Sequence, residues 1–60
     1  MTQVQPQRVY QNQRGELVLA MGNATYTENT SNVVVFQDLQ TKVIYVMPHG
    51  KFVDNFSVLN

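Results

Sequence analysis

The sequence predicts an all-β fold, either a small SH3-like barrel or a strongly bent antiparallel meander of four to five short strands. Three observations lead to this prediction. β-Branched and aromatic residues gather in short runs, of which residues 33–36 are the clearest. Glycine and proline separate these runs. No window carries the 3.6-residue apolar period of an amphipathic helix.

The first part of the chain is expected to supply an arm and two strands. Residues 1–7 are rich in glutamine and predict a flexible or edge-extended arm. Residues 8–13 alternate weakly between apolar and polar and predict a short strand, which Gly15 ends in a turn. Residues 16–21 follow as a strand with apolar side chains on both faces.

The second part continues the meander. Residues 22–32 form the most polar stretch of the chain and predict a long loop. Residues 33–39 are the strongest strand prediction, and residues 43–47 predict another strand that Pro48 ends. A tight turn or one turn of 3₁₀ helix is expected next, before a last short strand around residues 56–59.

Length limits the way in which these strands are buried. Sixty residues make one domain, residues 1–60, and a chain of this size has a marginal core. A small, strongly bent SH3-like barrel is the natural way to bury four or five such strands at this length, with a flatter sheet or a small α+β unit as the alternatives. Without cysteine the chain has no disulfide to stabilise it, so self-association remains as a means of stabilisation.

Three predicted strands are apolar on both faces, which a single sheet layer does not cover. In the first strand, one face carries Leu17, Leu19 and Met21 and the other carries Val18 and Ala20. In the second strand, the two faces carry Val33 and Val35, and Val34 and Phe36. In the third strand, they carry Ile44 and Val46, and Val43, Tyr45 and Met47. An antiparallel sheet with one wet face normally alternates apolar and polar residues. We therefore expect a homo-oligomer, dimeric or larger, although the arm and the last strand could cover part of this face.

Charge and composition exclude several classes of protein. Four basic and four acidic residues leave no net charge, which argues against general nucleic-acid binding. The apolar runs are much shorter than the roughly 20 residues of a membrane span. The first residues lack the pattern of a secretory leader, so a cytoplasmic location is expected, in the host cytoplasm if the gene belongs to a phage.

Catalytic and metal-binding chemistry find little support. His49 is the only histidine, and no serine or acid stands at a motif spacing from it. One histidine and no cysteine exclude the usual metal-ligand sets, so no cofactor is expected. An exposed turn histidine is the simpler interpretation of His49. The sequence therefore predicts a protein that is not an enzyme.

The polar stretch supplies a candidate ligand site. Its hydroxyls, amides, acid and aromatic ring suit a nucleobase or a ribose, and the candidate residues there are Thr25, Tyr26, Thr27, Glu28 and Asn29. Phosphates would need basic side chains nearby, and the candidates are Arg8, Arg14, His49 and Lys51. Tyr45 is the remaining candidate, as part of an adjoining aromatic surface. A solvated hairpin loop is the competing interpretation of this stretch.

Several short motifs resemble one known family. Counterparts are Tyr10, the turn Arg14-Gly15, the runs "LVLAMG", "NATYTENT" and "VVVFQDL", and the close "YVMPHGKF" with Pro48 and Phe52 at the family's spacing. In these the chain resembles DUF1653, a small bacterial and phage domain family of unknown function, over about three quarters of its length. Asn12, Tyr45 and Met47 depart from the pattern. The resemblance implies a compact SH3-like β domain and no known activity.

Two functional hypotheses follow. The first is a small cytoplasmic binding module, in one version a phage-encoded anti-defence protein that sequesters a nucleotide-derived immune signal of the host at a subunit interface. The alternative is a protein–protein inhibitor or adaptor, of the anti-restriction or anti-CRISPR type, that acts on a host protein through an exposed apolar β surface. An enclosed polar pocket would favour the first, and a large exposed apolar patch the second.

Overall fold

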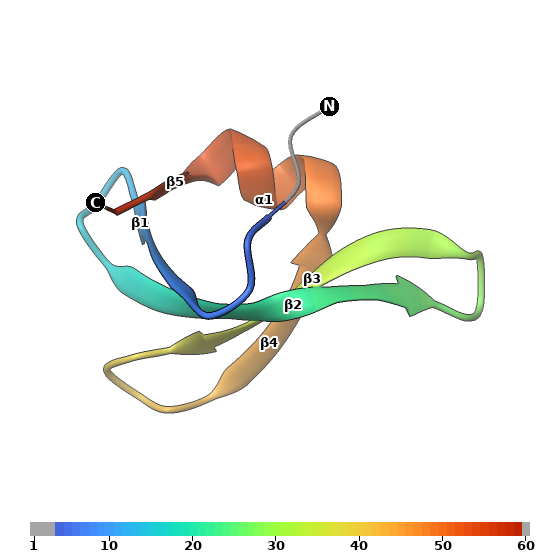
Figure 1. Cartoon of the computed structure of the whole chain (residues 1–60), viewed down its shortest axis with the longest axis horizontal. Helices are drawn as coiled ribbons and strands as arrows, with labels where there is room; N and C mark the ends of the chain where they lie inside the picture. The colour runs from blue at the N-terminus through green and yellow to red at the C-terminus, as the bar shows by residue number, and fades with distance from the viewer. Residues whose placement is uncertain (1–3, 60) are drawn as a thin grey trace.

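The computed structural model describes residues 4–59, which form one open antiparallel sheet of five strands and one short helix (Figure 1). The elements are β1 (Arg8–Asn12), β2 (Leu17–Tyr26), β3 (Ser31–Asp38), β4 (Ile44–Pro48), α1 (His49–Asn55) and β5 (Phe56–Val58). The predicted all-β meander is confirmed, and its five strands form an open sheet and not a closed barrel.

The sheet has the spatial order β4-β3-β2-β1-β5, so β4 and β5 are its two edge strands. Consecutive strands from β1 to β4 pair as hairpins, and β5 returns to pair with β1. α1 joins the two edges and contacts β3, β4 and β5, so it lies on one side of the bent sheet (Figure 1).

The core lies between the inner face of the sheet and α1. The buried apolar residues are Val4, Tyr10, Val18, Ala20, Val34, Phe36 and Phe52. Phe52 is fully buried, and its ring centroid lies 5.2 Å from that of Tyr10, 5.3 Å from that of Phe36 and 4.6 Å from that of Phe56. This aromatic cluster attaches the helix to the sheet.

The helix α1 is longer than the single turn that we expected after Pro48. Of its residues only Phe52 is buried, and the N–H of Phe56 donates to the carbonyl of Phe52 at its end. A helix of seven residues with one buried residue leaves no apolar period in the sequence, which is why pattern reasoning missed it. The strand after it, β5, is close to its predicted place.

The predicted arm, residues 1–7, is partly described. Residues 1–3 lie outside the described part of the chain. Val4 is only 2% exposed, and its carbonyl accepts a 2.9 Å hydrogen bond from Asn23 Nδ2. The N–H of Gln7 donates to the carbonyl of Ala20 at 2.7 Å. The described end of this segment therefore packs against β2 and contributes to the core.

The polar stretch 22–32 is mostly strand, which corrects the expectation of a long loop. β2 continues to Tyr26, and β3 begins at Ser31, which pairs with it. Only residues 27–30 form the turn, and Asn29 Oδ1 accepts hydrogen bonds from the N–H and the hydroxyl of Ser31. The two-stranded ribbon projects beyond the core (Figure 1), and residues 23–30 are all exposed, which is why polar side chains are tolerated in this part of the ladder.

Candidate functional site

The structure places the ten predicted site residues at several separate positions. Thr25, Tyr26, Thr27, Glu28 and Asn29 lie at the tip of the β2–β3 hairpin, whereas Arg14 lies in the β1–β2 turn at the other end of β2 (Figure 1). A ten-residue strand is about 30 Å long at 3.3 Å per residue. The longest dimension of the molecule is 31 Å. Within one chain these two groups do not border one small ligand.

The other candidates lie on the remaining elements. Arg8 begins β1 and is exposed, and Lys51 is exposed on α1. His49 begins α1 and is half-buried. Tyr45 lies on β4, where its ring stacks on Phe36 with 5.7 Å between the centroids. The hollow described below is lined by none of these four residues and by no residue of the hairpin tip.

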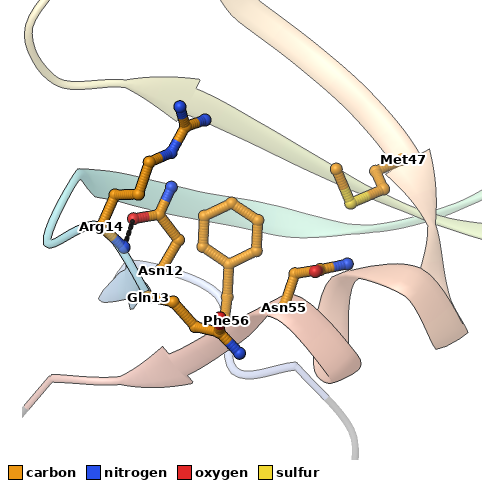
Figure 2. A pocket seen from close by; sticks show the side chains of 6 residues that line it. All are labelled: Asn12, Gln13, Arg14, Met47, Asn55 and Phe56. Atoms are coloured by element: carbon orange, nitrogen blue, oxygen red, sulfur yellow. Dashed lines mark hydrogen bonds between the residues drawn. The ribbon is translucent and has the colours of Figure 1, made fainter.

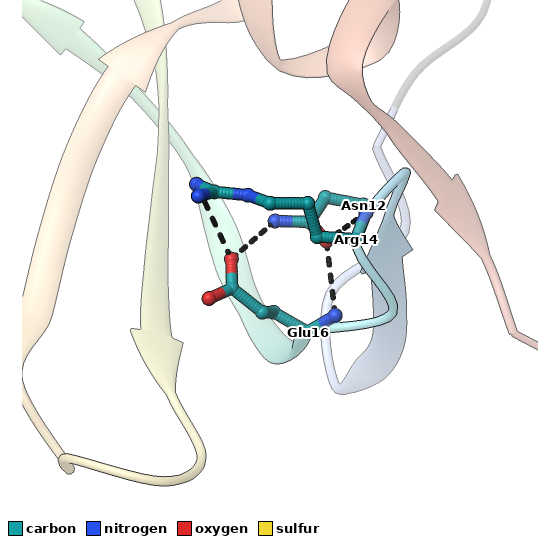
Figure 3. Close-up of polar contacts among 3 residues, drawn as sticks. All are labelled: Asn12, Arg14 and Glu16. Carbon is teal, nitrogen blue, oxygen red and sulfur yellow. Dashed lines mark hydrogen bonds and ion pairs between the residues drawn. The ribbon is translucent and has the colours of Figure 1, made fainter.

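The β1–β2 turn is held by one asparagine side chain (Figure 3). Asn12 Oδ1 accepts from the N–H of Arg14 at 3.0 Å and from that of Glu16 at 2.9 Å. Asn12 Nδ2 donates to Glu16 Oε1 at 2.7 Å, and the same oxygen lies 3.6 Å from Arg14 Nη2. Gly15 completes the turn with a φ of 83°, in the left-handed region that favours glycine. This network directs the Arg14 side chain into solvent.

A hollow of about 300 Å³ lies beside this turn. Its lining residues are Asn12, Gln13, Arg14, Met47, Asn55 and Phe56. Figure 2 shows the Phe56 ring standing among the amide side chains of Asn12 and Asn55, with Arg14 on one side and Met47 on the other. An aromatic ring, amides and one guanidinium can together contact a flat polar compound that carries a negative charge.

A second feature is the edge strand β4 with the residue before it. Val43, Ile44, Tyr45 and Val46 are 46%, 56%, 45% and 65% exposed, and we call these four residues the β4 surface. From Val43 to Pro48 the chain has no charged residue. Natural edge strands are usually protected by charge, bulges or covering elements, so an apolar edge of this kind is unusual.

Backbone groups at this edge point away from the sheet. The N–H of Asp38 donates to the carbonyl of Val43 at 2.9 Å, which makes them a hydrogen-bonded pair. Such pairs alternate along an antiparallel ladder, so Tyr45, two residues on, is directed toward its partner in β3. Ile44 and Val46 consequently direct their N–H and C=O groups outward, with no further strand beside them in the described sheet.

The outer face of the sheet continues this apolar edge. Val46 pairs with the half-buried Val35, while Ile44 pairs with Gln37 and through it with Leu19. Met21 on β2 is 41% exposed. The strands that look apolar on both faces thus put one face into the core and leave much of the other accessible. The expected homo-oligomer that covers this face stays a prediction.

The described part of the chain holds no cluster of three or more histidine, aspartate or glutamate side chains placed to bind a metal ion. In the same residues no helix is long and apolar enough to cross a membrane.

Sequence reasoning missed most of the hollow. Gln13, Asn55 and Phe56 stood in no motif, and the chain alone gives no sign that they meet Asn12. The apolar run at residues 43–47 did contain a signal, because its side chains alternate between two apolar faces. Its position at the sheet edge follows only from the strand order.

Comparison of the chain with known proteins does not assign it to a family. No family model, no curated protein and no solved structure matches the chain. The resemblance to DUF1653 stays a prediction that rests on its short motifs.

Proposed function

We propose that this chain is a small non-enzymatic binding module and that the β4 surface is its principal binding surface. The observation that supports it is the coincidence of three properties in one place: an edge strand, outward backbone groups and four consecutive exposed apolar side chains. A binding strand would gain hydrogen bonds and apolar burial together, as in recognition by β-strand addition.

The shape of this surface favours a protein-like occupant over a small ligand. Apolar burial stabilises by about 25 cal/mol per Å², and the β4 surface is extended, not concave. Exposed strand edges are recognised by other strands because only a strand matches the repeat of N–H and C=O groups. Recognition of a partner strand at this edge is the mode of binding expected of the adaptor or inhibitor class predicted from the sequence.

Hydrogen exchange at single amides tests the proposal. Protein isolated gently from cells that express it should protect the amides of Ile44 and Val46 as strongly as that of Tyr45, which already bonds within the sheet. In the isolated chain at high dilution, the first two amides should exchange fast. Fast exchange of Ile44 and Val46 in every preparation would contradict a covered edge.

A second candidate function rests on the hollow beside the β1–β2 turn. Its Phe56 ring, surrounding amides and Arg14 would suit a nucleotide-like compound, and its volume is at the lower end of the usual range for ligand sites. Sequestration of a nucleotide-derived host signal by a phage protein is the finer form of this hypothesis, with the site moved away from the hairpin tip.

Thermal shift with a series of nucleoside monophosphates tests this second candidate. The native chain should gain stability with at least one nucleotide, and the variant Arg14→Ala should lose that gain while unfolding at nearly the same temperature without ligand. Arg8→Ala is the matched control, because Arg8 is an exposed arginine that does not border the hollow. Equal losses in both variants would indicate nonspecific attraction of anions.

A further inference from the structure

We propose that the occupant of the β4 surface is a second copy of this chain, with the two β4 strands antiparallel and Tyr45 of each copy meeting on a twofold axis. The two sheets would then form one continuous sheet of ten strands. This inference rests on the proposed function, because it names the partner of the same surface.

Hydrogen bonding selects this register. With Tyr45 on the axis, Ile44 stands opposite the partner's Val46, and both are residues whose N–H and C=O groups point outward. Each N–H then faces a C=O of the other copy, which gives four hydrogen bonds and satisfies all eight outward groups of Ile44 and Val46 in the two strands.

The neighbouring register is poorer. If Val46 stood opposite the partner's Val46, Ile44 would stand opposite the partner's Pro48, which has no N–H. The C=O of Ile44 in each copy would then lack a donor. Of these two registers, the one with Tyr45 on the axis satisfies more backbone groups.

Side chains agree with the same register. On the outer face Ile44 meets the partner's Val46 twice, and pairs of β-branched residues stabilise antiparallel strands. On the inner face the two Tyr45 rings meet as a non-hydrogen-bonded pair, in which side chains approach most closely. No charged residue lies between Val43 and Pro48, so two identical strands bring no like charges together.

The dimer should be modest in strength. A standard interface buries about 800 Å² on each partner, and the whole described chain exposes 4474 Å². A standard interface would thus cover roughly a fifth of the molecule, more than one five-residue strand presents. We therefore expect a dimer that dissociates on dilution.

The register has a consequence for the hollow. Met47, one of its lining residues, would stand opposite the partner's Val43. The second copy would therefore lie next to the Met47 side of the hollow. Any free energy by which a ligand in the hollow changes dimer stability would equal the free energy by which the dimer changes ligand binding.

Disulfide trapping tests the register directly. The chain contains no cysteine, so Tyr45→Cys introduces its only thiol. Cα atoms of a non-hydrogen-bonded antiparallel pair are about 4.5 Å apart, within the range of a disulfide. Mild oxidation should give a covalent dimer, read by mass spectrometry at twice the 6.9 kDa chain mass.

Tyr26→Cys is the matched control, since Tyr26 is a similarly exposed tyrosine at the hairpin tip. At micromolar protein, Tyr45→Cys should cross-link about tenfold faster or more, because thiols in a formed dimer have an effective concentration in the millimolar range. Equal rates for the two variants would overturn the proposed axis.

Native mass spectrometry measures the dimer fraction of the unaltered chain, without any substitution that could disturb the fold. A dimer whose fraction falls on dilution, and falls further in Val46→Lys, is the expected result. A strict monomer whose Ile44 and Val46 amides are protected by a different bound protein would overturn the second copy and leave the proposed surface intact. A monomer with both amides exchanging fast in every preparation would overturn both proposals.

Discussion

Truncation of Phe52 to alanine is the most informative test of how this fold is stabilised. Phe52 is 0% exposed and is the one residue of α1 that is buried. Its ring lies within 4.6 to 5.3 Å of the rings of Phe56, Tyr10 and Phe36, measured between centroids. The change leaves a cavity between helix and sheet and removes three aromatic contacts at once.

The expected loss is large for so small a domain. Phe→Ala in a core costs about 3–5 kcal/mol of unfolding free energy, and each aromatic pair adds about 0.5–1.5 kcal/mol beyond its buried area. At about 0.05–0.15 kcal/mol per residue, a domain of 60 residues has roughly 3–9 kcal/mol in total. Phe52→Ala should therefore leave the chain partly or wholly unfolded at 25 °C.

Urea unfolding followed by circular dichroism measures this loss. All variants are compared at one protein concentration, because self-association adds a concentration-dependent term. Phe52→Leu should lose less than Phe52→Ala, since it keeps most of the apolar volume. Val53→Ala is the control on the same helix; Val53 is 38% exposed and should lose less than about 1 kcal/mol. If Phe52→Ala lost no more than Val53→Ala, the aromatic cluster would not be what attaches α1.

Two further predictions compare pairs of single substitutions, one pair at glycines and one pair in the β1–β2 turn. Gly15→Ala should lower the unfolding free energy by about 1–2 kcal/mol because its φ of 83° disfavours a side chain. Gly50→Ala in α1, where an added Cβ meets nothing within 4 Å, should raise the unfolding free energy by up to about 1 kcal/mol. Thermal unfolding temperatures that shift in the same direction for both variants would contradict this explanation. Asn12→Ala should cost roughly 1–2 kcal/mol by urea unfolding, since it removes two hydrogen bonds to backbone N–H groups. Glu16→Ala should cost less than Asn12→Ala, because the Arg14–Glu16 ion pair is exposed.

Local sequence chemistry predicted the strands well. Runs of valine and isoleucine extend easily, and glycine and proline end them, so β1, β3, β4 and β5 lie close to their expected places. The two misses have a common cause. Residues 23–26 are exposed and α1 has a single buried residue, so neither carries a run of apolar side chains, and pairing and packing decide their conformation.

The candidate site likewise depends on contacts between distant residues, which local sequence does not predict. The residues that suited a ligand chemically were chosen by type, and β2 separates Tyr26 from Arg14 by nearly the length of the molecule. The hollow instead joins Asn12 of β1, Met47 of β4 and Phe56 of β5. Those residues are brought together because the chain returns β5 to β1 after α1, and contacts between residues so distant in sequence leave no local signal.

The sequence by itself determined that the chain is all-β, that it lacks cysteine and net charge, and that three of its strands are apolar on both faces. These are properties of side chains and short segments. Only the tertiary structure decided which apolar face is buried and which strand is left at the edge. In the described sheet, Phe36 and Phe52 are buried between sheet and helix and β4 is an edge strand, so Ile44 and Val46 pair with β3 on one side and have no strand on the other.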